Sequence, residues 1–365
     1  MKRVVYGLLF ALLIAAFVAG GCGEPDRLKQ DLDRVAEEVV EIRGLSPKGE
    51  VPYQFVTTAE LRERLISDLE EDYPLEQMRI DQEVYVLLDL MTADQDLHAI
   101  LLDVYSEQVI GFYDDEAGEL YVVSDREELG PLEKVVFAHE YTHALQDQYF
   151  DLSSLPLDDE DNSDLALASI SLVEGDASLV QTSYMFGHLS RDDLRALIQE
   201  SQESETEMLE AAPRFVRETL TFPYIEGLRF VSALGGGEDI LQAYANIVLG
   251  LGVWDDIDQA YGDLPQSTEQ ILHPEKYLER DEPQDVIIPD LEGIPGPWWT
   301  PVRSDVLGEF GMRTYLETFV AQHTAESAAE GWDGDRYVYL LDRMEGEQLL
   351  VLRCTWDSEK DATEF

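Results

Sequence analysis

The chain has 365 residues, which fits one large domain or two of average size. Hydrophobic residues make up 45% of it, enough for a substantial core, so a disordered, collagen-like or mucin-like chain is excluded. The sequence has 25 Lys and Arg against 77 Asp and Glu, and the formal net charge of −52 would repel a phosphate backbone. We therefore expect no nucleic-acid partner.

The N-terminus has the layout of a secretory signal. Lys2 and Arg3 precede an apolar stretch over residues 4–18, and small residues then lead to Cys22. This ending resembles the lipoprotein box of bacterial lipoproteins, although that family prefers Leu where this chain has Ala19. The resemblance implies an extracytoplasmic protein anchored to the membrane through a lipidated Cys22. An uncleaved N-terminal anchor and plain secretion are the alternatives.

Hydrophobic periodicity predicts a mostly helical α+β chain with two β-hairpins. Helices are expected over residues 23–44, from Thr58, from Pro74, over 94–105, from Pro131 to Tyr149, over 165–186, over 191–220 in two pieces divided at Pro213, over 223–234, over 238–251 and over 306–329. A short strand is expected over residues 51–56, and the hairpins over 108–123 and 336–355.

Composition divides the chain into five segments. These are a signal segment (1–22), an N-terminal helical region (23–104), a central core (105–280), a connector rich in Pro and Gly (281–304), and a C-terminal helix plus hairpin that pack on the core (305–365).

One motif carries chemistry. His139 and His143 stand four residues apart on a predicted helix, so both imidazoles share a face and can hold one metal ion. Glu140 follows the first histidine and can reach a metal-bound water as a general base. A chance His-Glu-x-x-His is expected in roughly one of a hundred such chains, and the apolar residues around this one fit a buried helix. The motif therefore predicts one Zn²⁺ ion.

Catalytic zinc commonly has three protein ligands and an open position. The best candidate for the third ligand is Glu174, because a lone carboxylate in an otherwise apolar helix should be paired or bound to metal. Small neighbours, Gly175 and Ala177, are expected to let that helix pack closely on the histidine helix. Asp147, four residues beyond His143, is better suited to a supporting or surface position than to metal binding.

These residues resemble the gluzincin group of zinc metallopeptidases, in which His-Glu-x-x-His on one helix is joined by a downstream Glu, often in a Glu-Gly-x-Ala setting. The resemblance covers about residues 105–185 and implies a zincin-like core of hairpin, histidine helix and glutamate helix. It also implies His139, His143 and Glu174 as zinc ligands and Glu140 as general base. The hairpin would offer an edge strand to an extended peptide.

This chain departs from the gluzincin pattern at one position, which supports a metal ligand. Some gluzincins carry Asp four residues after the Glu ligand, where it orients the first histidine, but this chain has Ser178. Ligating histidines normally donate their second N–H to a carboxylate or carbonyl. Asp176 or Asp147 is therefore expected to replace that Asp.

A second polar cluster lies at residues 264–277 and contains His273. It is similar to a segment of a poorly characterised prokaryotic surface-protein family that has the same histidine helix. We consider His273 as an oxyanion donor or substrate contact, with a structural histidine as the alternative. Tyr184, Tyr224 and Arg229 are weaker donor candidates.

The sequence thus predicts an extracytoplasmic, membrane-anchored zinc metallopeptidase that acts on a peptide or protein substrate. A non-catalytic, metal-binding surface lipoprotein and a zinc hydrolase that acts on another bond are the alternatives. An intact Glu140 favours the enzymes, because a structural zinc site needs no base.

Overall fold

The computed structural model describes residues 25–107, 111–123, 129–203, 207–289, 296 and 298–365. The predicted signal segment, residues 1–22, lies outside this part of the chain, as do three residues of the first predicted hairpin. Within the described part, 16 α-helices and two three-stranded sheets form a mostly helical α+β protein. The predicted fold class is therefore confirmed at this level.

The helices are α2 (Pro25–Arg43), α3 (Thr58–Asp72), α4 (Leu75–Leu87), α5 (Leu97–Glu107), α6 (Pro131–Phe150), α7 (Ser163–His188), α8 (Arg191–Glu203), α9 (Glu207–Ala211), α10 (Arg214–Leu234), α11 (Ile240–Val248), α12 (Val253–Ala260), α13 (Thr268–Leu272), α14 (Pro274–Glu279), α15 (Gly308–Glu317), α16 (Gln322–Ala329) and α17 (Asp361–Glu364). The strands are β1 (Tyr53–Val56), β2 (Gly111–Asp114), β3 (Glu119–Val123), β4 (Trp299–Asp305), β5 (Trp332–Asp342) and β6 (Gln348–Trp356).

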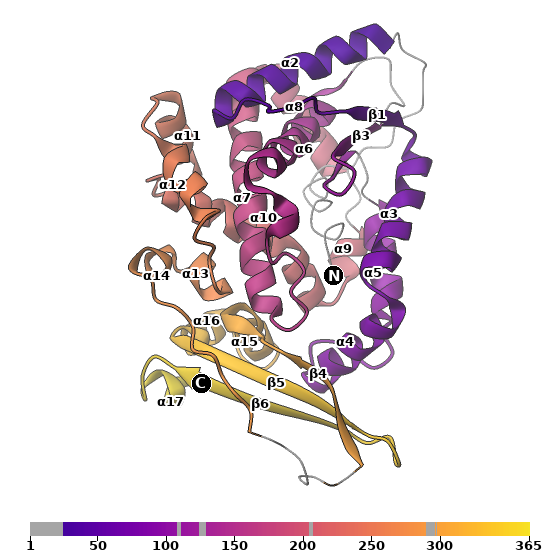
Figure 1. Cartoon of the computed structure of the whole chain (residues 1–365), viewed down its shortest axis with the longest axis vertical. Coiled ribbons are helices and arrows are strands. Elements are labelled where there is room, and N and C mark those ends of the chain that lie inside the picture. Colours follow the sequence, from indigo (N-terminus) through magenta and orange to yellow (C-terminus); the bar gives the residue numbers. More distant parts are fainter. Residues whose placement is uncertain (1–24, 108–110, 124–128, 204–206, 290–295, 297) are drawn as a thin grey trace.

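Three helices, α6, α7 and α10, form the centre of the molecule (Figure 1). α6 begins at Pro131, whose missing N–H costs nothing in the first turn of a helix. The side chains of α6 from residue 135 to 146 are all buried, as are nearly all of those of α7 up to Tyr184. A polar side chain on these helices therefore lies in an apolar interior and must find a partner there.

Helix α2 packs on both α6 and α7. Its apolar positions recur every three or four residues, and Leu32, Val35 and Val39 are at most 1% exposed. The helix ends where Gly44 takes φ +78°, a conformation that favours glycine. The amphipathic helix predicted over residues 23–44 is thus confirmed over Pro25–Arg43, and residues 23 and 24 lie outside the described part of the chain.

The first sheet has the strand order β1-β3-β2. Strands β2 and β3 form the predicted antiparallel hairpin, in which Tyr113 pairs with Leu120, while β1 runs parallel to β3. β2 is therefore an edge strand, and it packs against α6, the helix that carries both motif histidines.

The second sheet has the order β4-β5-β6 and forms the C-terminal end of the chain with α15, α16 and α17 (Figure 1). Its hairpin β5–β6 was predicted, whereas β4 occupies the last part of the predicted connector. At the end of β4, Asp305 accepts hydrogen bonds from Ser163 N at 2.7 Å and Ser163 Oγ at 2.5 Å, at the first residue of α7. The C-terminal sheet is thus joined to the start of α7.

Several predicted boundaries are wrong. Pro223 lies inside the continuous α10, because buried packing on both sides of the residue outweighs the lost hydrogen bond. The helix predicted over 306–329 is two helices, α15 and α16. Helix α13 ends at Leu272, and Pro274 begins α14, as the first helical position permits. None of the helices in the described ranges has the length and apolar character that crossing a membrane requires.

Candidate metal centre

Helix α6 brings His139 and His143 onto one face. Both side chains are buried, at 1% and 4% exposed, and their rings lie 4.6 Å apart in an edge-to-face arrangement. The Nε2 atoms of the two rings are 3.0 Å apart. Two imidazole nitrogens at this distance need a proton or a cation between them, because two lone pairs would repel each other.

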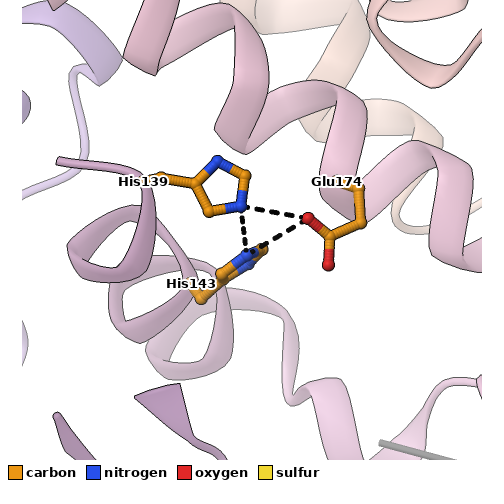
Figure 2. Close-up of side chains that lie close together, drawn as sticks. All are labelled: His139, His143 and Glu174. Atoms are coloured by element: carbon orange, nitrogen blue, oxygen red, sulfur yellow. Dashed lines mark hydrogen bonds and ion pairs between the residues drawn. The ribbon is translucent and has the colours of Figure 1, made fainter. Parts of the chain in front are cut away.

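Glu174 on α7 completes a triangle with the two histidines (Figure 2). Its Oε2 lies 3.1 Å from His139 Nε2 and 3.4 Å from His143 Nε2. Zinc binds nitrogen and oxygen at about 2.0–2.1 Å with tetrahedral geometry, which places neighbouring ligand atoms about 3.3 Å apart. The three donors therefore have the identity and the spacing of a metal site.

Gln146, which the sequence analysis missed as a site residue, decides which nitrogen of His143 faces this triangle. The Gln146 amide nitrogen donates to Val173 O and to Asp176 Oδ2, both at 3.0 Å, so its oxygen must face His143 Nδ1 at 2.8 Å. Because that oxygen only accepts, His143 Nδ1 carries the proton. The lone pair of a neutral His143 is then on Nε2, the atom that faces Glu174.

The charges of the three side chains are strongly coupled. Burial would lower the pKa of His143, but the charge and hydrogen bond of Glu174, together with the charge of Glu140 and the Gln146 hydrogen bond, raise it to about 9. Burial would likewise raise the pKa of Glu174, but the charges and hydrogen bonds of His143 and His139 together lower it. The pKa of His139 is lowered, chiefly because of burial. A proton on His143 thus balances the buried carboxylate, and a bound divalent cation would displace it.

Glu140 is held between α6 and the edge strand. Its side chain is 3% exposed, and Oε2 accepts a hydrogen bond of 2.9 Å from the backbone N–H of Tyr113 on β2. Burial raises the pKa of Glu140 to about 8, although the Tyr113 N–H and His143 act in the opposite direction. The Glu140 carboxyl group is thus held in an apolar interior and oriented by a backbone N–H of the hairpin, and its raised pKa makes it a stronger base than an exposed carboxylate.

Asp176 and Asp147, the two residues expected to support a histidine, accept hydrogen bonds from other side chains. Asp176 acts on His143 only through Gln146. Asp147 accepts from Tyr113 Oη at 2.8 Å and so holds the edge strand. Ser178 is buried, and its hydroxyl has no hydrogen-bond partner among the residues that the structure describes.

The close packing predicted at Gly175 occurs against another helix. A Cβ at Gly175 would collide with the carbonyl of Gly227, so this glycine lets α7 approach α10 and not the histidine helix α6. The expectation was wrong for Gly175, because Gly227 on α10, separate from the motif in sequence, meets it there.

His273 lies at the junction of α13 and α14, where Nε2 is 3.0 Å from Glu309 Oε1 and Nδ1 is 3.9 Å from Glu275 Oε1. These ion-pair contacts tie it to α15 and α14, and the predicted oxyanion role stays a prediction. Among the weaker donor candidates, Tyr224 lies beside His139, with ring centroids 6.2 Å apart. Tyr184 stacks on His188, and Arg229 pairs with Glu226 on the surface.

Comparison with known proteins identifies only part of the chain. Residues 300–365 match a domain of unknown function (DUF8575). This segment holds the C-terminal sheet with α15, α16 and α17, and it lacks all three residues of the triangle. No curated protein matches the chain, and no solved structure does. Support for a function therefore comes from the cluster of His139, His143 and Glu174.

Proposed function

We propose that the protein is a zinc metallopeptidase, extracytoplasmic and anchored to the membrane through its N-terminus. The observation that supports this most is the triangle of His139 Nε2, His143 Nε2 and Glu174 Oε2, with sides of 3.0–3.4 Å. Zinc suits this donor set, because two neutral imidazoles and one carboxylate are the ligands of a common class of catalytic zinc site.

In this proposal His139, His143 and Glu174 hold the ion. Zinc, when bound, lowers the pKa of a coordinated water to about 7 and polarises the carbonyl of the scissile bond. Glu140 accepts the proton of that water and later delivers it to the leaving amine. The Tyr113 N–H fixes the direction of Glu140, so the base is already oriented before substrate arrives.

Strand β2 is the proposed docking edge for an extended peptide. It is the outer strand of its sheet and lies against α6, next to the candidate base. The N–H of Tyr113 is already bonded to Glu140, so a peptide would pair with other backbone groups of the strand. The charge of −52 favours basic or neutral peptides over acidic ones.

The test compares the parent chain with Glu140→Gln. Both proteins should bind one zinc ion, while hydrolysis of casein or of a peptide library should fall at least about 1,000-fold in the variant, since a general base of this kind supplies 10²–10⁴-fold and the amide cannot replace it. Glu133→Gln, a change on the same helix outside the motif, is the matched control and should retain activity. Equal activity in parent and Glu140→Gln would remove the proposed base, and zinc binding without hydrolysis of any peptide would favour the metal-binding lipoprotein.

A further inference from the structure

A row of buried polar side chains leads from the end of α2 to His143. Arg43, the last residue of α2, places Nε 2.8 Å from Asp176 Oδ1 and one terminal nitrogen 3.1 Å from Asp176 Oδ2. Asp176 Oδ2 accepts from Gln146 at 3.0 Å, and Gln146 accepts from His143 Nδ1 at 2.8 Å. Arg43, Asp176 and Gln146 are all at most 1% exposed.

We propose that Arg43 is a positioning residue of the metal centre, acting through Asp176 and Gln146 on His143. The inference rests on the metal site of the proposed function. The two-point contact with Arg43 fixes both oxygens of Asp176, since a guanidinium and a carboxylate match in a planar fork. The fixed carboxylate then holds the Gln146 amide with its oxygen toward His143, which keeps Nε2 as the metal-facing atom.

Arg43 is itself held rigidly. The terminal nitrogen that contacts Asp176 also donates to Asp258 Oδ1 at 2.5 Å, and the guanidinium lies 4.6 Å from the ring centroid of Trp254. Trp254 in turn donates to Ile42 O at 2.7 Å, which ties α12 to the last turn of α2. The docking of α2 and the geometry of the metal site are therefore joined through one side chain, and we expect the metal affinity to depend on a helix that supplies no ligand.

Tyr261 provides a milder way to disturb the same carboxylate. Its hydroxyl donates to Asp176 Oδ2 at 2.9 Å, and its ring stacks on Phe150 with centroids 3.8 Å apart. Tyr261→Phe removes the hydrogen bond and keeps the ring, so the variant should fold.

The chain contains a second buried tyrosine that donates to a buried aspartate. Tyr73 donates to Asp81 at 2.6 Å, and the two residues are 1% and 3% exposed. Tyr73→Phe removes this hydrogen bond, as Tyr261→Phe removes the one to Asp176. It is therefore the control for a general loss of stability.

The experiment measures the zinc dissociation constant of the full chain by competition with a chromophoric chelator, together with the visible absorption of the cobalt-substituted protein. Gln146→Met should weaken zinc binding by about 10–100-fold, as loss of such a supporting hydrogen bond typically does. Arg43→Lys and Tyr261→Phe should weaken it by about 3–10-fold and alter the cobalt spectrum. Tyr73→Phe should stay within about 2-fold of the parent while lowering the melting temperature of the metal-free chain.

A double variant tests whether Arg43 acts on His143 through Gln146. If Arg43 acts through Gln146, Arg43→Lys adds nothing to the zinc dissociation constant of Gln146→Met, because the contact that carries the effect is already lost. Fully additive losses, or an effect of Arg43→Lys no larger than that of Tyr73→Phe, would overturn the proposal. A zinc-loaded parent that hydrolyses no peptide would refute the peptidase function and leave this affinity test intact, whereas a parent that binds no zinc overturns both.

Discussion

The backbone N–H of Tyr113 and the carboxylate of Glu140 are joined by a hydrogen bond of 2.9 Å, which connects an edge strand to the helix of the metal-ligand candidates. The same tyrosine is held a second time, because its hydroxyl donates to Asp147 one helical turn beyond His143. Strand β2 is thus fixed to α6 at two residues, Glu140 and Asp147, that flank His143 in the sequence.

Tyr113→Phe tests the second of these points. Loss of one buried hydrogen bond costs about 1 kcal/mol, so we expect the kcat for peptide hydrolysis to fall about 3–10-fold as the strand and Glu140 lose their fixed position. Zinc content should not change. Tyr121→Phe on the neighbouring strand, whose hydroxyl contacts Glu119, is the control and should retain the parent kcat. A loss of zinc in Tyr113→Phe would contradict this view of its role.

Removal of metal should destabilise the chain. Zinc at 100 times its dissociation constant adds about 2.7 kcal/mol to the free energy of unfolding, so dialysis against a strong chelator should lower the melting temperature and added zinc should restore it. Glu174→Gln should abolish this response. His98→Asn, which removes a partly exposed histidine beside Glu70, should preserve it. A response to zinc that survives in Glu174→Gln would place the ion elsewhere.

His273→Asn separates the two roles considered for that residue. Its imidazole is paired with the buried Glu309, and this hydrogen bond raises the pKa of His273. We expect the variant to keep its zinc and most of its kcat but to melt at a lower temperature, because Glu309 loses its partner. The opposite result, an unchanged melting temperature with kcat reduced more than about 100-fold, would support the oxyanion role.

Gly227→Ala should be among the most damaging single changes in the helical core. A Cβ at this position would collide with the backbone of Ser171, where α10 crosses α7 just before Glu174. Overpacking of this kind costs about 1–3 kcal/mol and would shift α7, so both stability and zinc affinity should fall. Gly49→Ala has open space around the new methyl group and is the control. Normal zinc affinity in a folded Gly227→Ala would show that α7 tolerates the shift.

The contact between α7 and α13 at Asp164 should weaken as pH rises. Burial raises the pKa of Asp164 to about 8, with hydrogen bonds from Thr268 acting against it. The native state therefore binds more protons than the unfolded chain between pH ~4 and ~8, and the free energy of unfolding decreases as pH rises through that window. Asp164→Asn should remove on the order of 2 kcal/mol of this decrease, measured by melting from pH 5 to 9. The exposed Asp158→Asn should leave it unchanged, and an equal slope in both variants would exclude Asp164 as its source.

The metal-ligand candidates could be predicted because local periodicity determines them. Two histidines four residues apart on a helix must share a face, and a carboxylate inside an apolar helix must find a partner. The β2–β3 hairpin and α2 were likewise predicted from sequence patterns that span only a few residues. The structure brings these elements together as expected, with Glu174 beside both histidines.

The supporting contacts could not be predicted, because they depend on which distant helices meet. Gln146 is an ordinary polar residue in the sequence, and its role appears only when α7 presents Asp176 and the carbonyl of Val173 to its amide. Arg43 lies 133 residues from its partner Asp176. The continuous α10 was missed for a related reason, since tertiary packing overrides the local preference of Pro223.

The hydrogen bonds from Ser163 to Asp305 fix the position of the first residue of α7 on the C-terminal sheet. Glu174 follows eleven residues later, about three turns and roughly 16 Å along the helix. The number of residues from Ser163 to Glu174 therefore determines where Glu174 lies relative to Asp305. Inserting or deleting one residue within this stretch would turn Glu174 by about 100° away from the histidines, so its residue types can change more freely than its length.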